Sequence, residues 1–287
     1  MDSLSIAHFL NAFLMIAMPI GLAIYLTRRW NLGWRIWLLG AVTFILSQVG
    51  HIPFNWGVGQ LLNRTGMVSW NPTAQLIFNA VFLGLSAGIF EEVARYLVLR
   101  WWVKDARSWR MGVLFGAGHG GAEAIILGAL VLYSFIQMMA LRNTDLSTIV
   151  PANQLALAQQ QMTAYWSMTW YYSLIGALER FFTIPCQIAM AVMVMQVFTR
   201  KRIRWLFLAI GYHALLDATA VLGVRYLGIY WTEASVCGFA VLSVILIFVL
   251  RQPEPPADLA PAAPAPALYT PEPVEETTEN LDKTRYQ

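Results

Sequence analysis

Residues 74–99 read AQLIFNAVFLGLSAGIFEEVARYLVL, an apolar run that nevertheless contains Glu91, Glu92 and Arg95. A helix of about 20 apolar residues is long enough to span the ~30 Å hydrocarbon core of a bilayer. A charged group at the centre of that core costs at least about 2.5–3.5 kcal/mol. The run therefore predicts a membrane-spanning helix whose charged side chains face the protein interior and have a function.

The composition of the whole chain indicates a membrane protein. The sequence is 58% hydrophobic and 12% charged, and this charged fraction is about half that of a soluble domain. Apolar runs of spanning length recur along it, at roughly 5–27, 36–54, 74–99, 111–139, 168–199, 205–223 and 228–250. We predict an all-α fold, a polytopic transmembrane helical bundle of about seven spans within the lipid bilayer.

The distribution of lysine and arginine predicts the orientation of the spans. Clusters of these residues follow the first, third and fifth spans, whereas the intervening loops hold one arginine each. Cytoplasmic loops are the ones enriched in Lys and Arg, so we expect the N-terminus outside and the C-terminus in the cytoplasm. The opening MDSLS lacks a basic signal-peptide segment, so the first span is expected to be an uncleaved anchor. The basic excess is this topological signal and implies no nucleic-acid partner.

Two segments differ in composition from the spans. Residues 252–287 are rich in proline and alanine and then acidic, which predicts a disordered cytoplasmic tail after a membrane domain at 1–251. The loop 140–167 is polar and rich in glutamine, and a short amphipathic helix on the outer surface is expected there. His8 and His51 lie near span ends and are expected at the membrane interface.

Small residues recur every four positions in two spans. Gly84 and Gly88 form such a pair in the third span, and Gly112, Gly116 and Gly120 form two in the fourth. This spacing allows helix backbones to approach closely in lipid. We therefore expect the third and fourth spans to be neighbours.

The ionisable residues within the spans are spaced for contact along their helices. Arg95 is four residues from Glu91 and three from Glu92, so it can reach both carboxylates. Two histidines each precede an acid by four residues, which would orient the imidazole. These pairs are His119 with Glu123 and His213 with Asp217. Glu179 and Arg180 are adjacent and expected on different faces, with a structural role or a bond to Glu123.

Depth brings three of these spans together. Glu91, His119 and His213 each lie about nine residues from a basic residue at the cytoplasmic boundary, which is about 13 Å along a helix. A single buried Glu–Arg pair or histidine is more often structural. Three helices that deliver Glu, His and His to one plane favour a functional site, which we expect to open to the cytoplasmic side.

These residues form three motifs, Glu91-Glu92-Val-Ala-Arg95, Phe115-Gly-Ala-Gly-His119 and His213-Ala-Leu-Leu-Asp217. Over roughly residues 5–250 the chain resembles the YhfC family of bacterial membrane proteins. That family belongs to the superfamily of CAAX-prenyl-processing and bacteriocin-processing proteases and PrsW-like proteases. The resemblance implies a CAAX-protease-like core in a bacterial plasma membrane. Two departures are Arg95, one residue nearer the double Glu than in CAAX-type members, and Asp217 in place of Asn, which argues against prenyl-protein substrates.

The resemblance implies an intramembrane endopeptidase acting near the cytoplasmic side on a membrane-embedded or membrane-anchored peptide. In this hypothesis Glu91 is the general base helped by His119, and Glu92 with Arg95 sets the local field. His213, oriented by Asp217, stabilises the oxyanion. A zinc version would use His119, His213 and Glu91 as ligands. We favour catalysis without a cofactor, because Arg95 already serves the two carboxylates.

Two functions of other classes compete with hydrolysis. Intramembrane carboxylates and histidines also build proton relays, so a proton-coupled carrier is one alternative. The other is a non-catalytic scaffold similar to the gamma-secretase assembly subunit of the same superfamily. No inverted repeat is recognised, and the ionisable residues are expected at one depth instead of along a path. Both expectations argue against the carrier, and the presence of both glutamates and both histidines argues against the scaffold.

Overall fold

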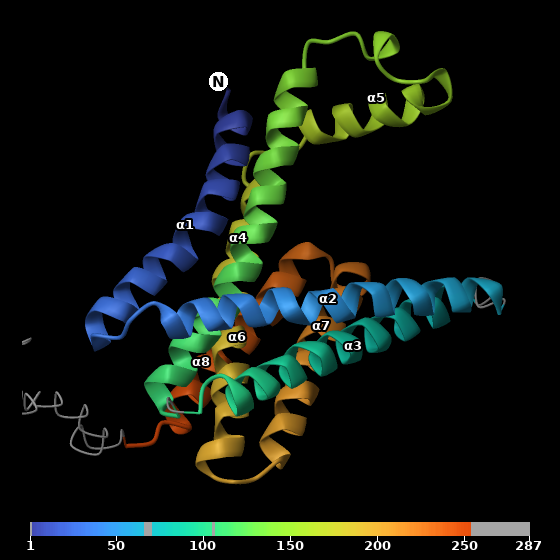
Figure 1. Ribbon diagram of the computed structural model, residues 1–287. Helices are drawn as coiled ribbons and strands as arrows, with labels where there is room; N and C mark the ends of the chain where they lie inside the picture. The colour runs from blue at the N-terminus through green and yellow to red at the C-terminus, as the bar shows by residue number, and fades with distance from the viewer. Residues whose placement is uncertain (1, 66–70, 105–106, 254–287) are drawn as a thin grey trace, which may run out of the picture. The chain divides into compact units, whose positions relative to one another are not determined.

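The computed structural model describes residues 2–65, 71–104 and 107–253 (Figure 1). Within these ranges seven helices are long and apolar enough to cross a membrane, which confirms the prediction of a helical bundle with about seven spans. The described ranges contain no strand. The predicted tail lies outside the described residues from position 254 onward, so its disorder stays a prediction.

The described part of the chain forms eight α-helices and two short 3₁₀ turns. The turns are η2 (Leu146–Thr148) and η3 (Tyr172–Leu174). The helices are α1 (Ser3–Trp30), α2 (Arg35–Arg64), α3 (Pro72–Trp101), α4 (Trp109–Leu141), α5 (Ala152–Trp166), α6 (Ile175–Thr199), α7 (Arg204–Tyr226) and α8 (Ile229–Val249).

The long runs become helices because lipid offers no hydrogen-bond partners to a backbone. A helix pairs its own N–H and C=O groups, and only its ends need other partners. At the start of α1 the Asp2 side chain accepts a hydrogen bond from the Ser5 amide at 2.8 Å. Asn71 caps α3 in the same way through Ala74, and Pro72 fills the first turn, where its missing N–H costs nothing.

The expected short helix in the loop 140–167 is present as α5. Its sequence ANQLALAQQQMTAYW is too polar to span a membrane, and none of its residues is buried. His8 of α1 stacks on Tyr165 with ring centroids 4.1 Å apart, so α5 is attached to the first helix at its last turn. His8 is therefore a packing residue of this contact.

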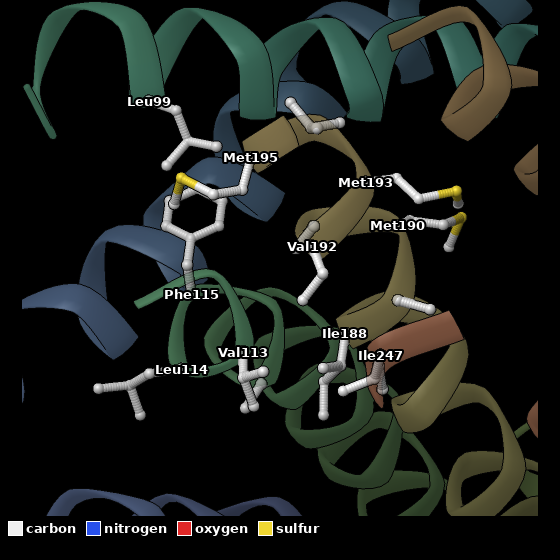
Figure 2. Packing of buried hydrophobic residues seen from close by; sticks show 14 of the residues in the cluster. Leu99, Val113, Leu114, Phe115, Ile188, Met190, Val192, Met193, Met195 and Ile247 are labelled. Carbon is white, nitrogen blue, oxygen red and sulfur yellow. The ribbon is translucent and has the colours of Figure 1, made fainter. Parts of the chain in front are cut away.

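Helix α6 lies at the centre of the bundle and packs against α1, α3, α4, α7 and α8. Its spanning window is 72% buried, compared with 17–33% for the other six spanning helices of the described chain. Val192 and Met195 of this helix meet Phe115 of α4 and Leu99 of α3 in one apolar cluster (Figure 2). Large apolar side chains on the outer helix faces remain exposed, as suits contact with lipid.

The small-residue faces are used, but the predicted pairing of the third and fourth spans is wrong. Gly84 and Gly88 of α3 face α7, because a Cβ on either would lie within 2.8 Å of an α7 carbonyl oxygen. Gly116 and Gly120 of α4 face α6. Glycine spacing identifies the face of a helix that packs closely, and the partner of that face depends on the whole bundle.

A further close contact joins α2 to α4. A Cβ on Gly118 would lie 1.9 Å from the carbonyl oxygen of Trp37, and a Cβ on Gly40 would lie 2.0 Å from that of Phe115. Only glycine allows the two backbones to meet this closely. Close glycine contacts thus join α2 to α4, α3 to α7 and α4 to α6, and α2 also packs on α3 (Figure 1).

Candidate active site

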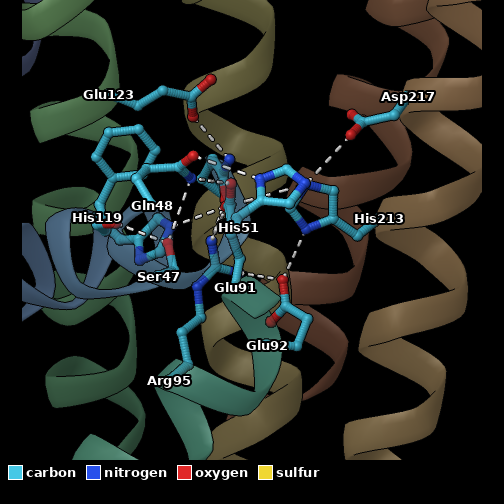
Figure 3. Close-up of polar contacts among 12 residues, drawn as sticks. Ser47, Gln48, His51, Glu91, Glu92, Arg95, His119, Glu123, His213 and Asp217 are labelled. Atoms are coloured by element: carbon cyan, nitrogen blue, oxygen red, sulfur yellow. Dashed lines mark hydrogen bonds and ion pairs between the residues drawn. The ribbon is translucent and has the colours of Figure 1, made fainter. Parts of the chain in front are cut away.

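Three spanning helices bring the predicted site residues together (Figure 3). Glu91 of α3 and His119 of α4 are hydrogen-bonded through Oε2 and Nε2, which lie 3.0 Å apart. His213 of α7 contacts Glu92 through Nδ1 and Oε1 at 2.9 Å. The other ring nitrogen of His213, Nε2, lies 4.0 Å from Glu91 Oε2. Glu91 therefore stands between the two imidazoles.

Glycines on both sides of His119 explain how α4 delivers this ring to the centre of the bundle. Gly118 lies against the α2 backbone, and a Cβ on Gly120 would lie 2.7 Å from the Gln187 side chain on α6. His119 is held between these helices and is fully buried. Its Nδ1 atom is buried without a hydrogen-bond partner among the described residues.

Arg95 serves the two glutamates unequally. Its guanidinium is fully buried, and Nη1 donates to Glu92 Oε1 at 2.6 Å. Nη2 donates to Gln187 and lies 3.6 Å from Glu91 Oε2, beyond hydrogen-bond reach. Arg95 therefore neutralises Glu92 directly and affects Glu91 mainly through its field.

Helix α2 contributes polar groups that sequence analysis did not assign to the site. Gln48 donates from Nε2 to Glu91 Oε1 at 3.1 Å, so it holds the carboxylate oxygen opposite His119. His51, expected at the interface, instead contacts Gln48 and the Ser86 hydroxyl, with Asn55 beyond it. Gln48, His51 and Asn55 are spaced by three and four residues, which places them on one helix face. This spacing is the sequence feature that could have assigned α2 to the site.

Glu123 does not orient His119 as predicted. Its carboxylate accepts hydrogen bonds from Arg180 Nη1 at 2.5 Å and Gln187 Nε2 at 2.7 Å, both on α6. Arg180 also donates to Glu179, so these adjacent residues meet despite the expectation of different faces. The cation on α6 attracts the Glu123 carboxylate away from its own helix. A chain of hydrogen bonds thus links Arg95 through Gln187 and Glu123 to Arg180. The ionisable residues therefore occupy more than the single depth expected from the sequence.

Asp217 lies beside His213, as its spacing predicts. Asp217 Oδ2 is 3.6 Å from His213 Nε2, which is an ion-pair distance longer than a hydrogen bond. The Asp217 side chain is 36% exposed, whereas those of Glu91 and His213 are 7% and 4% exposed. Asp217 is therefore the most accessible carboxylate beside the paired glutamates and histidines.

The donors suggested for zinc have the right chemical types, but their surroundings do not fit the ion. Among the described residues, no three His, Cys, Asp or Glu side chains stand close enough to share a metal. Glu91 Oε2 and His213 Nε2 are 4.0 Å apart, more than the roughly 3.3 Å expected between two ligands of tetrahedral zinc. Arg95 Nη2 also places a fixed positive charge 3.6 Å from the same glutamate oxygen.

Comparison with known proteins identifies the family of this site. The model of the YhfC intramembrane metalloprotease family matches residues 14–236, which include all three motifs. The chain belongs to this family. The uncharacterized membrane protein YhfC of Bacillus subtilis (strain 168) is 28% identical over 222 residues, covering 75% of this chain and 83% of that protein. No solved structure matches the chain.

Membership in the YhfC family fits the architecture described above. The family description names an intramembrane metalloprotease, and the chain is a multi-pass membrane protein with ionisable groups buried in its spans. The matched region includes Gln48 and Gln187 as well as the predicted Glu91, His119 and His213.

Proposed function

We propose that the chain is an intramembrane endopeptidase that hydrolyses a peptide bond with water activated by Glu91. The observation that supports this most directly is the position of the Glu91 carboxylate between two buried imidazoles. Its Oε2 atom is 3.0 Å from His119 Nε2 and 4.0 Å from His213 Nε2. The substrate is a membrane-embedded or membrane-anchored peptide.

In the proposed reaction, the water is activated beside Glu91 Oε2. Glu91 takes one proton from the water, and the hydroxide oxygen attacks the carbonyl carbon of the peptide bond. The carbonyl oxygen becomes an oxyanion, and the carbon–nitrogen bond then breaks. Glu91 returns its proton to the leaving nitrogen, so the two products are a carboxylic acid and an amine.

The neighbours of Glu91 have supporting roles in this proposal. Gln48 and His119 each hold one oxygen of the Glu91 carboxylate, which fixes its orientation before the substrate binds. His213 would donate a hydrogen bond to the oxyanion from Nε2 while Nδ1 remains on Glu92. Asp217 lies 3.6 Å from His213 Nε2 and helps to orient the ring, and Arg95 neutralises Glu92. The family description names a metalloprotease, but the side chains present do not fit zinc, so no step of this proposal uses a metal.

The proposal is tested by Glu91→Gln, which keeps the shape of the side chain and removes its basicity. Purified wild-type and variant proteins in liposomes are incubated with a panel of membrane-anchored peptides, with and without a chelator. A general base contributes about 10²–10⁴-fold, so we expect at least about a hundredfold loss of hydrolysis.

The matched control is Glu233→Gln, which makes the same change at a buried glutamate of α8. It should retain activity. The two variants should also elute as folded protein in detergent. Hydrolysis by Glu91→Gln at the wild-type rate would refute the role of Glu91.

A further inference from the structure

The five helices around the site run in alternating directions, so their polar residues can be placed above or below Glu91. Helices α2, α4 and α7 run away from the basic loops, whereas α3 and α6 run toward them. Glu123 and Asp217 each lie one turn beyond the histidine of their helix, on the side away from the basic loops. Arg180 lies two turns before Gln187, and it bonds Glu123, so it is on the same side.

Helices α2 and α3 repeat this arrangement. Asn55 lies two turns beyond Gln48 along α2, and Ser86 lies five residues before Glu91 along α3. Both contact His51 through its ring Nε2, at 2.8 and 3.1 Å. Five helices thus place polar groups on one side of Glu91. We call this set the polar side of the site: Asn55, Ser86, Glu123, Arg180 and Asp217.

The opposite side, toward the basic loops, is apolar. Leu99, Leu114 and Phe115 are fully buried, and Val192 and Met195 are each 1% exposed. Leu99, Phe115 and Met195 belong to one buried apolar cluster (Figure 2). These five residues form the apolar side of the site. Glu92, Arg95 and Gln196 also lie there and are buried. Arg95 donates to Glu92 and Gln187, and Glu92 also contacts His213.

Water follows polar groups and stays out of tightly packed apolar regions. On the polar side the Asp217 and Glu123 side chains are 36% and 19% exposed. No residue of the apolar side exceeds 1%. The difference indicates the direction from which solvent reaches Glu91.

We propose that water and the scissile peptide bond reach Glu91 from the polar side, at the end of the bundle opposite the basic loops. The proposal rests on the proposed hydrolysis and specifies the side from which the substrate reaches the site. With basic loops in the cytoplasm, the polar side faces the outer surface, so water and the substrate enter from outside and the bond is cleaved at the depth of Glu91. This differs from the expected opening to the cytoplasm, which depended on the depth of Glu91 and not on the packing around it.

The test uses two cysteines on α7, each one turn from His213 in opposite directions. Asp217→Cys lies on the polar side, and Ala209→Cys lies toward the apolar side, where Ala209 is fully buried. Both are placed in full-length protein in which Cys186 and Cys237 are alanine. A membrane-impermeant thiol reagent is added to intact cells and, separately, to inverted vesicles.

Two exposed reference cysteines report the sides of the membrane. Ser147→Cys lies between α4 and α5, and Arg202→Cys lies between α6 and α7. We expect Asp217→Cys to be labelled from the same side as Ser147→Cys, and Ala209→Cys to remain unlabelled from both sides. If Asp217→Cys fails to fold, the half-buried Ala220→Cys one turn further along α7 replaces it.

Three results would overturn the proposal: labelling of Asp217→Cys only from the Arg202→Cys side, labelling of Ala209→Cys, or no labelling of either. Labelling requires no hydrolysis, so its outcome is independent of the Glu91→Gln experiment. If labelling contradicts the access route but hydrolysis still depends on Glu91, only this proposal fails. If labelling agrees but hydrolysis does not depend on Glu91, the proposed function fails.

Discussion

Replacing Gly88 by alanine should move α7 away from α3 and displace His213. The new Cβ would lie 2.8 Å from the Ile210 carbonyl oxygen and 3.4 Å from the His213 Cβ. The first distance must grow to the roughly 3.4 Å of an ordinary contact, so the helices must separate locally by about 0.6 Å. The obstructing carbonyl oxygen belongs to the backbone of α7, so no flexible side chain can give way.

Two magnitudes follow from this displacement. Overpacking a well-packed interior costs about 1–3 kcal/mol, so the variant should lose thermal stability in detergent. A 1 Å misplacement at a catalytic centre costs about a hundredfold in rate, so a shift of about half that size should reduce hydrolysis about tenfold. Stability is measured as the fraction of protein that remains monodisperse after heating. Activity is measured on the membrane-anchored peptides.

Gly112→Ala is the matched control, because it makes the same change on another spanning helix, α4, without obstruction. The nearest atom to its added Cβ is Met195 Cβ at 3.4 Å, an ordinary contact. We expect its stability and activity to equal those of the wild type. If Gly88→Ala were indistinguishable from Gly112→Ala in both measurements, the close α3–α7 contact would not determine the position of His213.

Three further predictions concern the charges and the cofactor. Arg95→Ala leaves Glu92 buried without its cation and should lower stability by about 3–5 kcal/mol. The control Arg100→Ala, at an exposed arginine, should not lower it. Equal yields of folded protein from the two variants would contradict this. Gln187→Leu removes hydrogen bonds from Arg95 and Glu123 and should cost about 1–3 kcal/mol in thermal unfolding, and an unchanged midpoint would show these bonds to be dispensable. Protein without a histidine tag should contain well below one equivalent of zinc by elemental analysis and retain hydrolysis in chelator; stoichiometric zinc, lost together with activity, would contradict our interpretation.

The parts of this fold that sequence predicts are those that depend on a single helix. Span number follows from the length of each apolar run, and the confirmed seven spanning helices required no knowledge of their neighbours. The depths of Glu91, His119 and His213 are counted along their own helices from the basic boundary. The structure brings these side chains to one centre, because each lies at a similar residue count from the basic end of its helix.

The parts that sequence could not predict depend on which helices are adjacent. Gln48 and Gln187 are uncharged amides, so neither stands out in an apolar span as Glu91 does, and their roles depend on contacts to another helix. The pairing of Glu123 with Arg180 instead of His119 has the same origin. Spacing along α4 allows Glu123 to reach His119, but Arg180 on α6 forms a stronger, charge-assisted hydrogen bond with it.

The close α3–α7 and α2–α4 contacts have a consequence for how a peptide could enter the site. The α3–α7 pair holds Glu91 and His213, and the α2–α4 pair holds His119 and Gln48, so the bonds of Glu91 to His119 and Gln48 cross the boundary between the pairs. Any movement that parts the two pairs to make room for a peptide must also pull the carboxylate from both partners. Such an opened protein would lack an oriented base, and closure around the peptide would restore it. Protection of other membrane proteins from unwanted cleavage would then come from the backbone contacts of a few glycines.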